Sequence, residues 1–317
     1  MKSSSIRSIA LAILLSRSSL LLAGVILCIA ILFSHAFVAP ARQQDDEVVR
    51  VSADLVVLNV TVTDAAGKYV HRVPRSVFTV FEDESEQKIT TFSAEETPFA
   101  VALLLDSSGS MEGRISLARA AAINFLDGMR ADDVAAIYHF DTKVERLQDF
   151  SPGRDLPPIA YDVKAKGWTV LNDAIVRASV DLSQRPEKRR AIVVLSDGAD
   201  TRSRASSDKA LASALAANAT IYTVDMSPTD ASSINKQASA GALRNFAAKS
   251  GGKFVATPGG KALSEAFTGI VEELRNQYTI GYQPTNRAHE GRWRALEVRV
   301  ARPSLSARTR RGYRAPK

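Results

Sequence analysis

Two uninterrupted apolar runs constrain the fold of this 317-residue chain more than any other feature. Continuous apolar runs of this length are typical of strands that are buried on both faces, as in parallel sheets covered by helices. A helical pattern follows the first run, with apolar residues at steps of three and four from Ile115 to Met129. The sequence therefore predicts an α/β domain with a doubly wound, mostly parallel sheet and helices on both faces. The two runs are Val101-Ala102-Leu103-Leu104-Leu105 and Ala191-Ile192-Val193-Val194-Leu195.

The same alternation of strands and helices continues through the central part of the chain, which we assign to residues 97–277. Parallel strands need long crossover connections, and the helical segments between the predicted strands supply them. The predicted strands span residues 100–105, 134–140, 144–150 (an edge strand), 191–195, 220–225 and 253–256. The predicted helices span residues 115–129, 171–182, 209–217, 240–249 and 263–275.

Short β-like segments separated by turn residues flank this domain, within residues 48–96 before it and residues 278–317 after it. A few isolated strands bury too little apolar surface to be stable alone. We therefore expect the two groups to pair into one small flanking β-sandwich, with the α/β domain inserted between them. The predicted strands span residues 55–63, 77–81 and 88–93, with an acidic turn at 82–86, and then residues 277–282, 293–300 and 306–313.

Residues 1–41 have the pattern of a secretory signal peptide. A basic start is followed by an uncharged, strongly apolar stretch that ends in Ala39-Pro40-Ala41. The alternative is an uncleaved membrane anchor, because residues 18–41 are almost long enough to span a bilayer. In both cases we expect an exported protein in the periplasm, the cell envelope or the extracellular space. Cys28 is the only cysteine, so the chain after the leader has no disulfide.

The net charge of +7 is concentrated near the end of the chain. Residues 287–317 contain ten lysines and arginines against two glutamates. Many of these charges alternate with apolar residues, which is the pattern of the solvent-exposed face of a strand. No nucleic-acid-binding motif accompanies them, so we expect no nucleic-acid partner.

Polar residues gather where the predicted strands of the central sheet end. Asp106, Ser108 and Ser110 follow the first apolar run, Asp197 follows the second, and Thr169 precedes a predicted helix between them. Ligands bind at this carboxyl edge in open α/β sheets, so we expect these side chains to converge. All of them offer oxygen, and none of the three segments contains histidine or cysteine. Such donors favour Mg²⁺, with Mn²⁺ or Ca²⁺ as alternatives.

These residues resemble the metal-ion-dependent adhesion site of von Willebrand factor type A domains. Asp106, Ser108 and Ser110 match the D-x-S-x-S element, Thr169 the second-loop threonine, and Asp197 the third-loop aspartate. The resemblance covers residues 97–277. With its flanking strands, the whole chain resembles an Acidobacteria-type family of secreted bacterial proteins related to this domain, which implies architecture more than activity.

The resemblance implies that the metal keeps one open position, which an aspartate or glutamate of a partner protein fills. The expected function is therefore non-enzymatic, metal-dependent protein binding, as in an adhesin or a scaffold. Trp168 departs from the family pattern, and we place Trp168 and Met111 on the rim that contacts the partner. A Mg²⁺- or Mn²⁺-dependent phosphoester hydrolase and a structural protein with a vestigial site remain alternatives. The oligomeric state and the partner's identity stay open.

Overall fold

The computed structural model describes residues 55–197, 200–227, 234–257, 259–288 and 290–316, all within the compact unit Ala53–Lys317. The predicted leader at residues 1–41 lies outside the described residues. Among the residues described, no helix is both long and apolar enough to cross a bilayer.

The strands are β1 (Val56–Asp64), β2 (Phe78–Glu82), β3 (Ser85–Gln87), β4 (Ile89–Ser93), β5 (Phe99–Asp106), β6 (Val134–Phe140), β7 (Val144–Ser151), β8 (Arg189–Ser196), β9 (Ala219–Asp225), β10 (Phe254–Ala256), β11 (Tyr278–Tyr282), β12 (Trp293–Val300), β13 (Leu305–Arg308) and β14 (Gly312–Arg314). The α-helices are α2 (Ile115–Asp127), α3 (Ile159–Asp162), α4 (Leu171–Ser183), α5 (Ser207–Ala216), α6 (Ile234–Ser250) and α7 (Gly260–Asn276). Two 3₁₀ turns are η1 (Arg75–Val77) and η2 (Gly109–Met111).

A six-stranded sheet in the order β10-β9-β8-β5-β6-β7 forms the centre of the α/β domain. All its neighbouring strands are parallel except β6 and β7, so the expected edge strand β7 runs antiparallel to the rest. Every residue of β5 is buried, which explains the continuous apolar run in its sequence. The predicted doubly wound α/β fold is confirmed.

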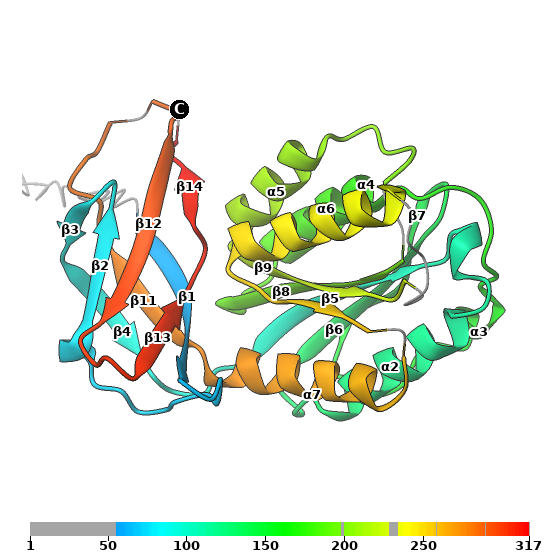
Figure 1. Ribbon diagram of the computed structural model, residues 1–317, viewed down its shortest axis with the longest axis horizontal. Coiled ribbons are helices and arrows are strands. Elements are labelled where there is room, and N and C mark those ends of the chain that lie inside the picture. Colours follow the sequence, from blue (N-terminus) through cyan, green and yellow to red (C-terminus); the bar gives the residue numbers. More distant parts are fainter. Residues whose placement is uncertain (1–54, 198–199, 228–233, 258, 289, 317) are drawn as a thin grey trace, which may run out of the picture. The chain divides into compact units, whose positions relative to one another are not determined.

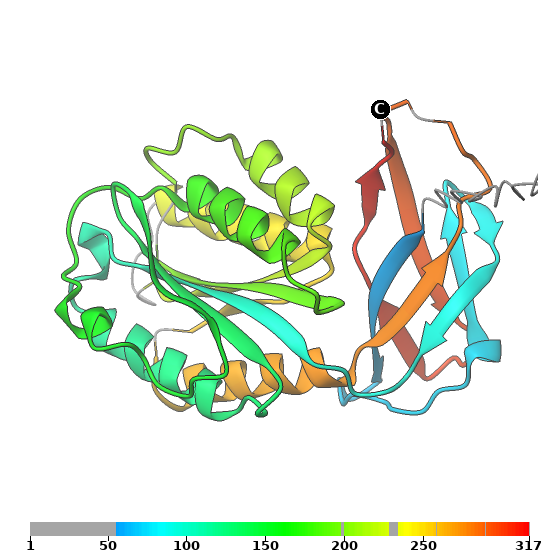
Figure 2. The same ribbon diagram turned by 180° about the vertical axis from the view of Figure 1, so that it is seen from behind.

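Helices cover both faces of this sheet, α2 and α7 on one and α4, α5 and α6 on the other (Figures 1 and 2). Alternate residues of β5 pack against the helices on opposite faces of the sheet, because successive side chains of a strand point to opposite faces. Phe99, Val101 and Leu103 pack in the core that contains α2 and α7. Ala100 and Leu104 pack in the core that contains the other three helices.

The terminal strands form a flanking β-sandwich, as expected. One sheet has the order β13-β1-β11-β4, and the other has the order β14-β12-β2-β3. Each sheet joins strands from before and after the α/β domain, because β1 pairs with β11 and β13, and β2 pairs with β12. Apolar side chains of both sheets meet in a third core that includes Leu58, Val60, Val80 and Ile280.

Three details of the sequence prediction are wrong. The acidic turn at 82–86 is shorter than expected, because its second half forms β3 against β2. The last predicted strand is split, since β13 pairs with β1 in one sheet while β14 pairs with β12 in the other. Helix α6 starts at Ile234 rather than near residue 240.

The basic tail also departs from a purely solvated face. The side chain of Arg294 lies on the inner face of β12, and the residue is 5% exposed. Its guanidinium donates to Glu82 Oε1 at 2.9 Å, so the charge is paired inside the sandwich. Arg299, also on β12, is exposed as predicted and pairs with Glu297.

Two buried charges link the α/β domain to the sandwich strands. The first is Arg189 at the start of β8, which is fully buried. Its guanidinium donates to the carbonyl oxygens of Glu95 and Gln277, which lie in the two chain connections between the α/β domain and the sandwich. Burial lowers the pKa of Arg189 to about 10, and the carbonyl oxygens supply hydrogen bonds in place of water.

The second buried charge is Glu273 on α7, which is 1% exposed. Its carboxylate accepts hydrogen bonds from Thr61 Oγ1 at 3.1 Å, from the Tyr222 hydroxyl at 2.8 Å and from the Tyr69 hydroxyl at 3.2 Å. The Arg308 guanidinium completes the set as an ion pair. One carboxylate therefore connects α7 and β9 of the α/β domain with β1 and β13 of the sandwich.

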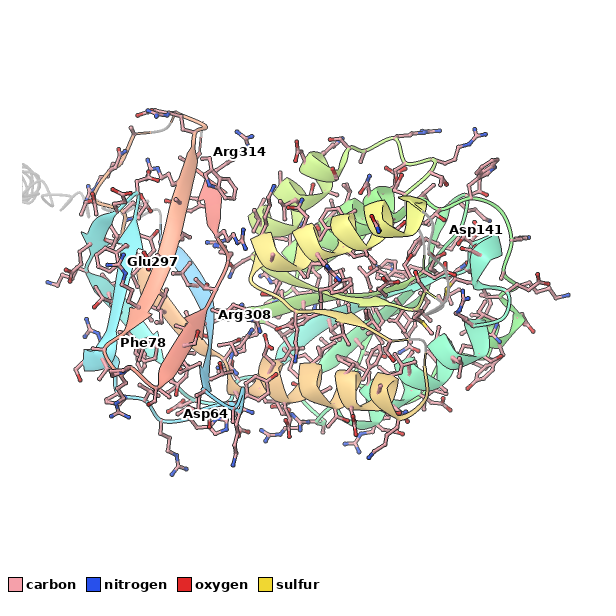
Figure 3. The ribbon with its side chains drawn as sticks, viewed as in Figure 1. Asp64, Phe78, Asp141, Glu297, Arg308 and Arg314 are labelled. Carbon is pink, nitrogen blue, oxygen red and sulfur yellow. The ribbon has the colours of Figure 1, made fainter. Side chains whose placement is uncertain are left out.

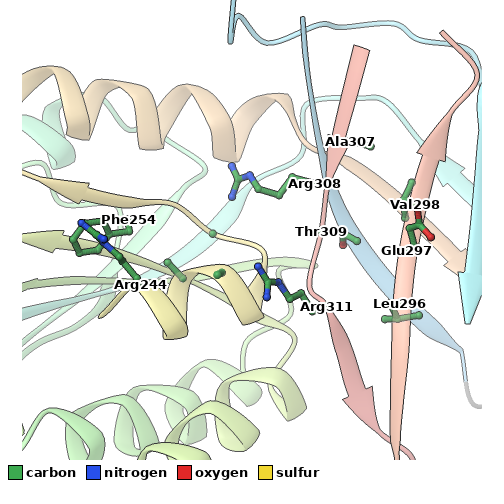
Figure 4. Close-up of a pocket in the computed structure, with 12 residues that line it drawn as sticks. Arg244, Phe254, Leu296, Glu297, Val298, Ala307, Arg308, Thr309 and Arg311 are labelled. Atoms are coloured by element: carbon green, nitrogen blue, oxygen red, sulfur yellow. The ribbon is translucent and has the colours of Figure 1, made fainter. Parts of the chain in front are cut away.

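Arg308 also lines an open groove of about 520 Å³, shown in Figure 4, and is labelled again in Figure 3. One wall of the groove comes from α6 and β10, where Arg244 stacks on the Phe254 ring at 4.7 Å. The other wall comes from β12, β13 and the segment after β13. The Arg308 guanidinium also donates to the Gly251 carbonyl oxygen, so it contacts the α/β domain at both Glu273 and Gly251.

The Glu273→Ala substitution is expected to lower the free energy of unfolding by about 3–5 kcal/mol, because it leaves the Arg308 charge partly buried without its partner. Urea denaturation followed by circular dichroism measures this change. The matched control is Glu272→Ala, since Glu272 is the exposed neighbour on the same helix, and it should change stability by less than about 0.5 kcal/mol. Equal effects of the two substitutions would show that the buried network does not stabilise the junction.

Candidate metal centre

The parallel register of the central sheet brings the predicted residues Asp106 and Asp197 to the same edge of the sheet. Leu105 on β5 lies opposite Leu195 on β8, so the next residues, Asp106 and Ser196, are neighbours at the ends of their strands. Asp106 is fully buried, and Ser196 Oγ donates a hydrogen bond to its Oδ2 atom. Asp197 follows Ser196 directly.

The Asp106 carboxylate is held on both oxygens. The backbone N–H of Ser108 donates to Oδ1 at 2.8 Å, which closes a tight turn after β5. Burial raises the pKa of Asp106 to about 6, although the bonds from Ser196 and Ser108 lower it, and the nearby charge of Asp197 raises it further. The site thus contains an ionisable acid whose charge is poorly solvated and which a bound cation would stabilise.

A chain of hydrogen bonds joins the serines to the third-loop aspartate. Ser108 Oγ and Ser110 Oγ are 3.1 Å apart, and Ser110 Oγ donates to Asp197 Oδ1 at 2.6 Å. Four of the five predicted ligands, Asp106, Ser108, Ser110 and Asp197, therefore lie together at the carboxyl edge of the sheet. Asp141, labelled in Figure 3, follows β6 at the same edge and accepts a bond from the Lys143 N–H.

The loop that carries the fifth residue is docked on the turn after β5. The Lys166 N–H donates to the Ser107 carbonyl oxygen at 2.9 Å, and the Gly109 N–H donates to the Gly167 carbonyl oxygen at 3.3 Å. Gly167 has a φ of +76°, and a Cβ atom there would lie 2.4 Å from Thr142 Oγ1. The positive φ favours glycine at this position, and a Cβ atom there would also displace the Thr142 hydroxyl.

Thr169 itself is fixed through its backbone. The Thr169 N–H donates to Thr201 Oγ1 at 3.0 Å, and the Thr169 carbonyl oxygen accepts from the Thr201 and Arg202 N–H groups at 2.9 and 3.1 Å. Thr169 is 5% exposed, and its hydroxyl makes no hydrogen bond with another residue of the described ranges. The second loop is thereby fastened to the segment that follows Asp197.

The sequence suggested that Asp200 and Thr201 either support the site or lie on the surface, and Thr201 does hold the backbone of Thr169. Two other contributors were missed. Ser196 holds Asp106, and its only sequence signal is its place next to Asp197. Arg114 was not anticipated at all. Its Nη1 atom forms an ion pair with Asp197 Oδ2 and donates to the Ser110 carbonyl oxygen at 3.2 Å.

The two predicted rim residues differ in exposure. Trp168 is 52% exposed, and the Arg202 guanidinium lies 4.6 Å from the centre of its ring. Met111 does not lie on the rim: it is fully buried in the core that contains α2 and α7. Met111 is the last residue of the 3₁₀ turn η2, in which Gly109 and Ser110 are exposed and only Met111 is buried.

The donors at this edge fit a hard divalent cation, since they are hydroxyl and carboxylate oxygens. Across the described residues, no group of three or more histidines, cysteines, aspartates or glutamates is arranged to hold a metal. A metal here would therefore depend on the serine and threonine hydroxyls as well as on the two aspartates. That requirement agrees with the hydroxyl-rich composition of the three loops.

A serine, a histidine and a glutamate also form a chain beside this site. Ser107 Oγ lies 3.0 Å from His139 Nδ1, and His139 Nε2 lies 2.8 Å from Glu145 Oε2. Ser107 is 1% exposed and its hydroxyl also contacts the Phe140 carbonyl oxygen at 3.2 Å. The adjoining cavity measures about 10 Å³, which is room for about one water molecule. This chain therefore cannot present its serine to a substrate in the described conformation.

Residues 101–199 match the family described as von Willebrand factor type A domain. The matched region contains both apolar strands, helix α2, the Thr169 loop and Asp197. None of the curated proteins matches the sequence.

Several solved structures are similar in fold. The D319A mutant of the PilB minor pilin from Streptococcus sanguinis is 15% identical, with 57% of this chain and 62% of that chain covered and a TM-score of 0.46. The von Willebrand factor type A protein from Catenulispora acidiphila is 11% identical, covering 83% of this chain and 72% of that chain with a TM-score of 0.47. The von Willebrand factor domain of the type V pili tip protein Mfa5 from Porphyromonas gingivalis is 14% identical, with 56% of this chain and 95% of that chain covered and a TM-score of 0.46. This chain spans about three fifths of the length of the minor pilin.

The matched region and the six-stranded sheet with helices on both faces lead to one assignment. The central part of this chain contains a von Willebrand factor type A domain.

Proposed function

We propose that this protein binds a partner protein through a divalent metal ion, and that Asp106, Ser108, Ser110, Thr169 and Asp197 hold the metal. One observation carries the proposal: Asp106, Ser108, Ser110 and Asp197 lie together at the ends of β5 and β8, and the Thr169 loop is docked on the same turn. The donor set favours Mg²⁺, with Mn²⁺ or Ca²⁺ as alternatives.

The charges of these residues explain why a partner carboxylate is the proposed ligand. Hydroxyls add no charge to the metal, and the two aspartates together balance its two positive charges. When bound, the metal would supply a positive centre that attracts one further oxygen ligand. An aspartate or glutamate side chain on a partner protein has the required charge and donor atom.

The surface beside the proposed centre supports a protein partner. Trp168 presents half of its surface to solvent beside Thr169, with the Arg202 guanidinium on its ring. Tryptophan and arginine are the residues most enriched at energetically dominant positions of protein interfaces. We therefore retain Trp168 as the proposed partner contact, and the arginine favours an acidic partner.

An adhesin or scaffold fits this proposal better than an enzyme. Metal-dependent hydrolysis needs a general base that reaches the attacking water. The nearby histidine, His139, is only 7% exposed and is engaged with Ser107 and Glu145. Two of the solved structures of similar fold are described as a minor pilin and a pilus tip protein. The proposed location outside the cytoplasm rests on the sequence of residues 1–41.

The first test is metal binding by isothermal titration calorimetry. Mg²⁺ should bind the wild-type protein, and Asp106→Ala should weaken the affinity by at least about tenfold, because it removes a buried carboxylate ligand. The matched control is Asp127→Ala on the exposed end of α2, which should bind as wild type does. Equal affinities of wild type and Asp106→Ala, with both proteins folded by circular dichroism, would refute the assignment.

The raised pKa of Asp106 gives a second prediction, on the stability of the protein in EDTA. The folded-state pKa of about 6 lies above the ordinary 3.8, so between these values the folded protein holds a proton that the unfolded chain has lost. The contribution of Asp106 to the free energy of unfolding should therefore rise as the pH falls from 7 to about 4, by up to about 3 kcal/mol.

Asp106→Asn isolates this contribution, because the amide has nearly the same shape and does not titrate. In EDTA at pH 7 the variant should be more stable than the wild type by roughly 1–3 kcal/mol, and the difference should shrink towards pH 4. Saturating Mg²⁺ should stabilise only the wild type. Thermal unfolding of both proteins over this pH range measures the difference, and a difference that does not vary with pH contradicts the raised pKa.

A further inference from the structure

Arg114 occupies a position from which it can influence metal binding at the proposed site. It stands at the residue before α2, and its guanidinium pairs with Asp197 Oδ2 while donating to the Ser110 carbonyl oxygen. The Asp197 side chain is only 3% exposed, whereas that of Arg114 is 21% exposed. The guanidinium therefore covers the third-loop carboxylate from the solvent side.

The start of helix α2 does not explain an arginine at this position. The side chain of Arg114 makes no capping hydrogen bond to the helix. A positive charge at a helix N-terminus is unfavourable, because the N-terminal end of the helix dipole is itself positive. The contact that compensates for this placement is the ion pair with Asp197.

We propose that Arg114 sets the affinity of the site for its divalent cation by competing for the Asp197 carboxylate. This inference rests on the proposed function. Both oxygens of Asp197 are engaged, Oδ1 by the Ser110 hydroxyl and Oδ2 by Arg114. A cation held by Ser110 and Asp197 draws on the same oxygen atoms, and its charge repels the guanidinium. Metal binding would therefore weaken the Arg114–Asp197 ion pair, and the ion pair would weaken metal binding.

The exposure of Arg114 makes the competition reversible. Water can solvate the released arginine, and the bound cation would take its place as the positive partner of the buried Asp197 carboxylate. The arginine thus lowers the affinity without blocking the site, and the domain should load with metal only at a higher concentration of free cation.

Calorimetric titration of the full chain with Mg²⁺ tests this role. Arg114→Gln removes the charge and should bind Mg²⁺ roughly three- to tenfold more tightly than wild type. Arg114→Lys keeps the charge without the guanidinium fork and should give an intermediate affinity. The matched control is Arg119→Gln on α2, whose guanidinium contacts the Val163 carbonyl oxygen and the Tyr161 ring, and its affinity should equal that of wild type.

Thermal unfolding in EDTA separates competition from a merely structural role. Arg114→Gln should unfold at a lower temperature than wild type, because Asp197 loses its partner, while binding Mg²⁺ more tightly. A structural role predicts that stability and affinity fall together. Unchanged or weaker Mg²⁺ binding by Arg114→Gln would overturn the competition and leave the proposed function intact. Absence of Mg²⁺ binding by the wild type would instead overturn the proposed function, and this inference with it.

Discussion

The structure of the candidate site depends on one constraint, which is that a carboxylate at the end of the central strand is removed from water. Asp106 is fully buried, and an ionised carboxylate in such a place is costly unless hydrogen bonds or a cation compensate it. The Ser196 hydroxyl and the Ser108 N–H supply part of this compensation. Burial still prevails, as the raised pKa shows. A cation at the proposed centre would add to this compensation, because it would stabilise the ionised form of the carboxylate.

The parallel sheet is what makes this convergence possible. Parallel strands end at one edge, so residues far apart in sequence, such as Asp106 and Ser196, become neighbours without any local signal linking them. At the opposite ends of the strands, the Arg189 guanidinium donates hydrogen bonds to carbonyl oxygens in both chain connections to the sandwich. Glu273 then joins α7 to β1 and β13. The sheet is therefore anchored at its amino edge and carries the polar loops at its carboxyl edge.

The sequence predicts the fold and the convergence of Asp106, Ser108, Ser110 and Asp197 at one edge of the sheet, but it does not predict which other side chains pair with buried charges. Apolar runs identify buried strands because burial on both faces leaves a pattern within a few residues. Arg114 and Arg294 are different, since each is explained by a carboxylate far away in the chain, Asp197 and Glu82. Met111 was misplaced because a single 3₁₀ turn decides whether a residue after the serine pair points outward or into the core.

The two aspartates of the proposed centre are compensated in different ways, and this difference matters for how tightly a metal could be held. Asp106 is surrounded by neutral donors, so a cation there replaces poor solvation with direct charge neutralisation. Asp197 already has a positive partner, so a cation there must replace an existing ion pair. The free energy of metal binding would therefore be the gain at Asp106 minus the cost of breaking the Asp197–Arg114 ion pair. If the proposed centre binds a metal, one acid with only neutral hydrogen-bond partners and one acid with a positive partner would together favour moderate, exchangeable binding.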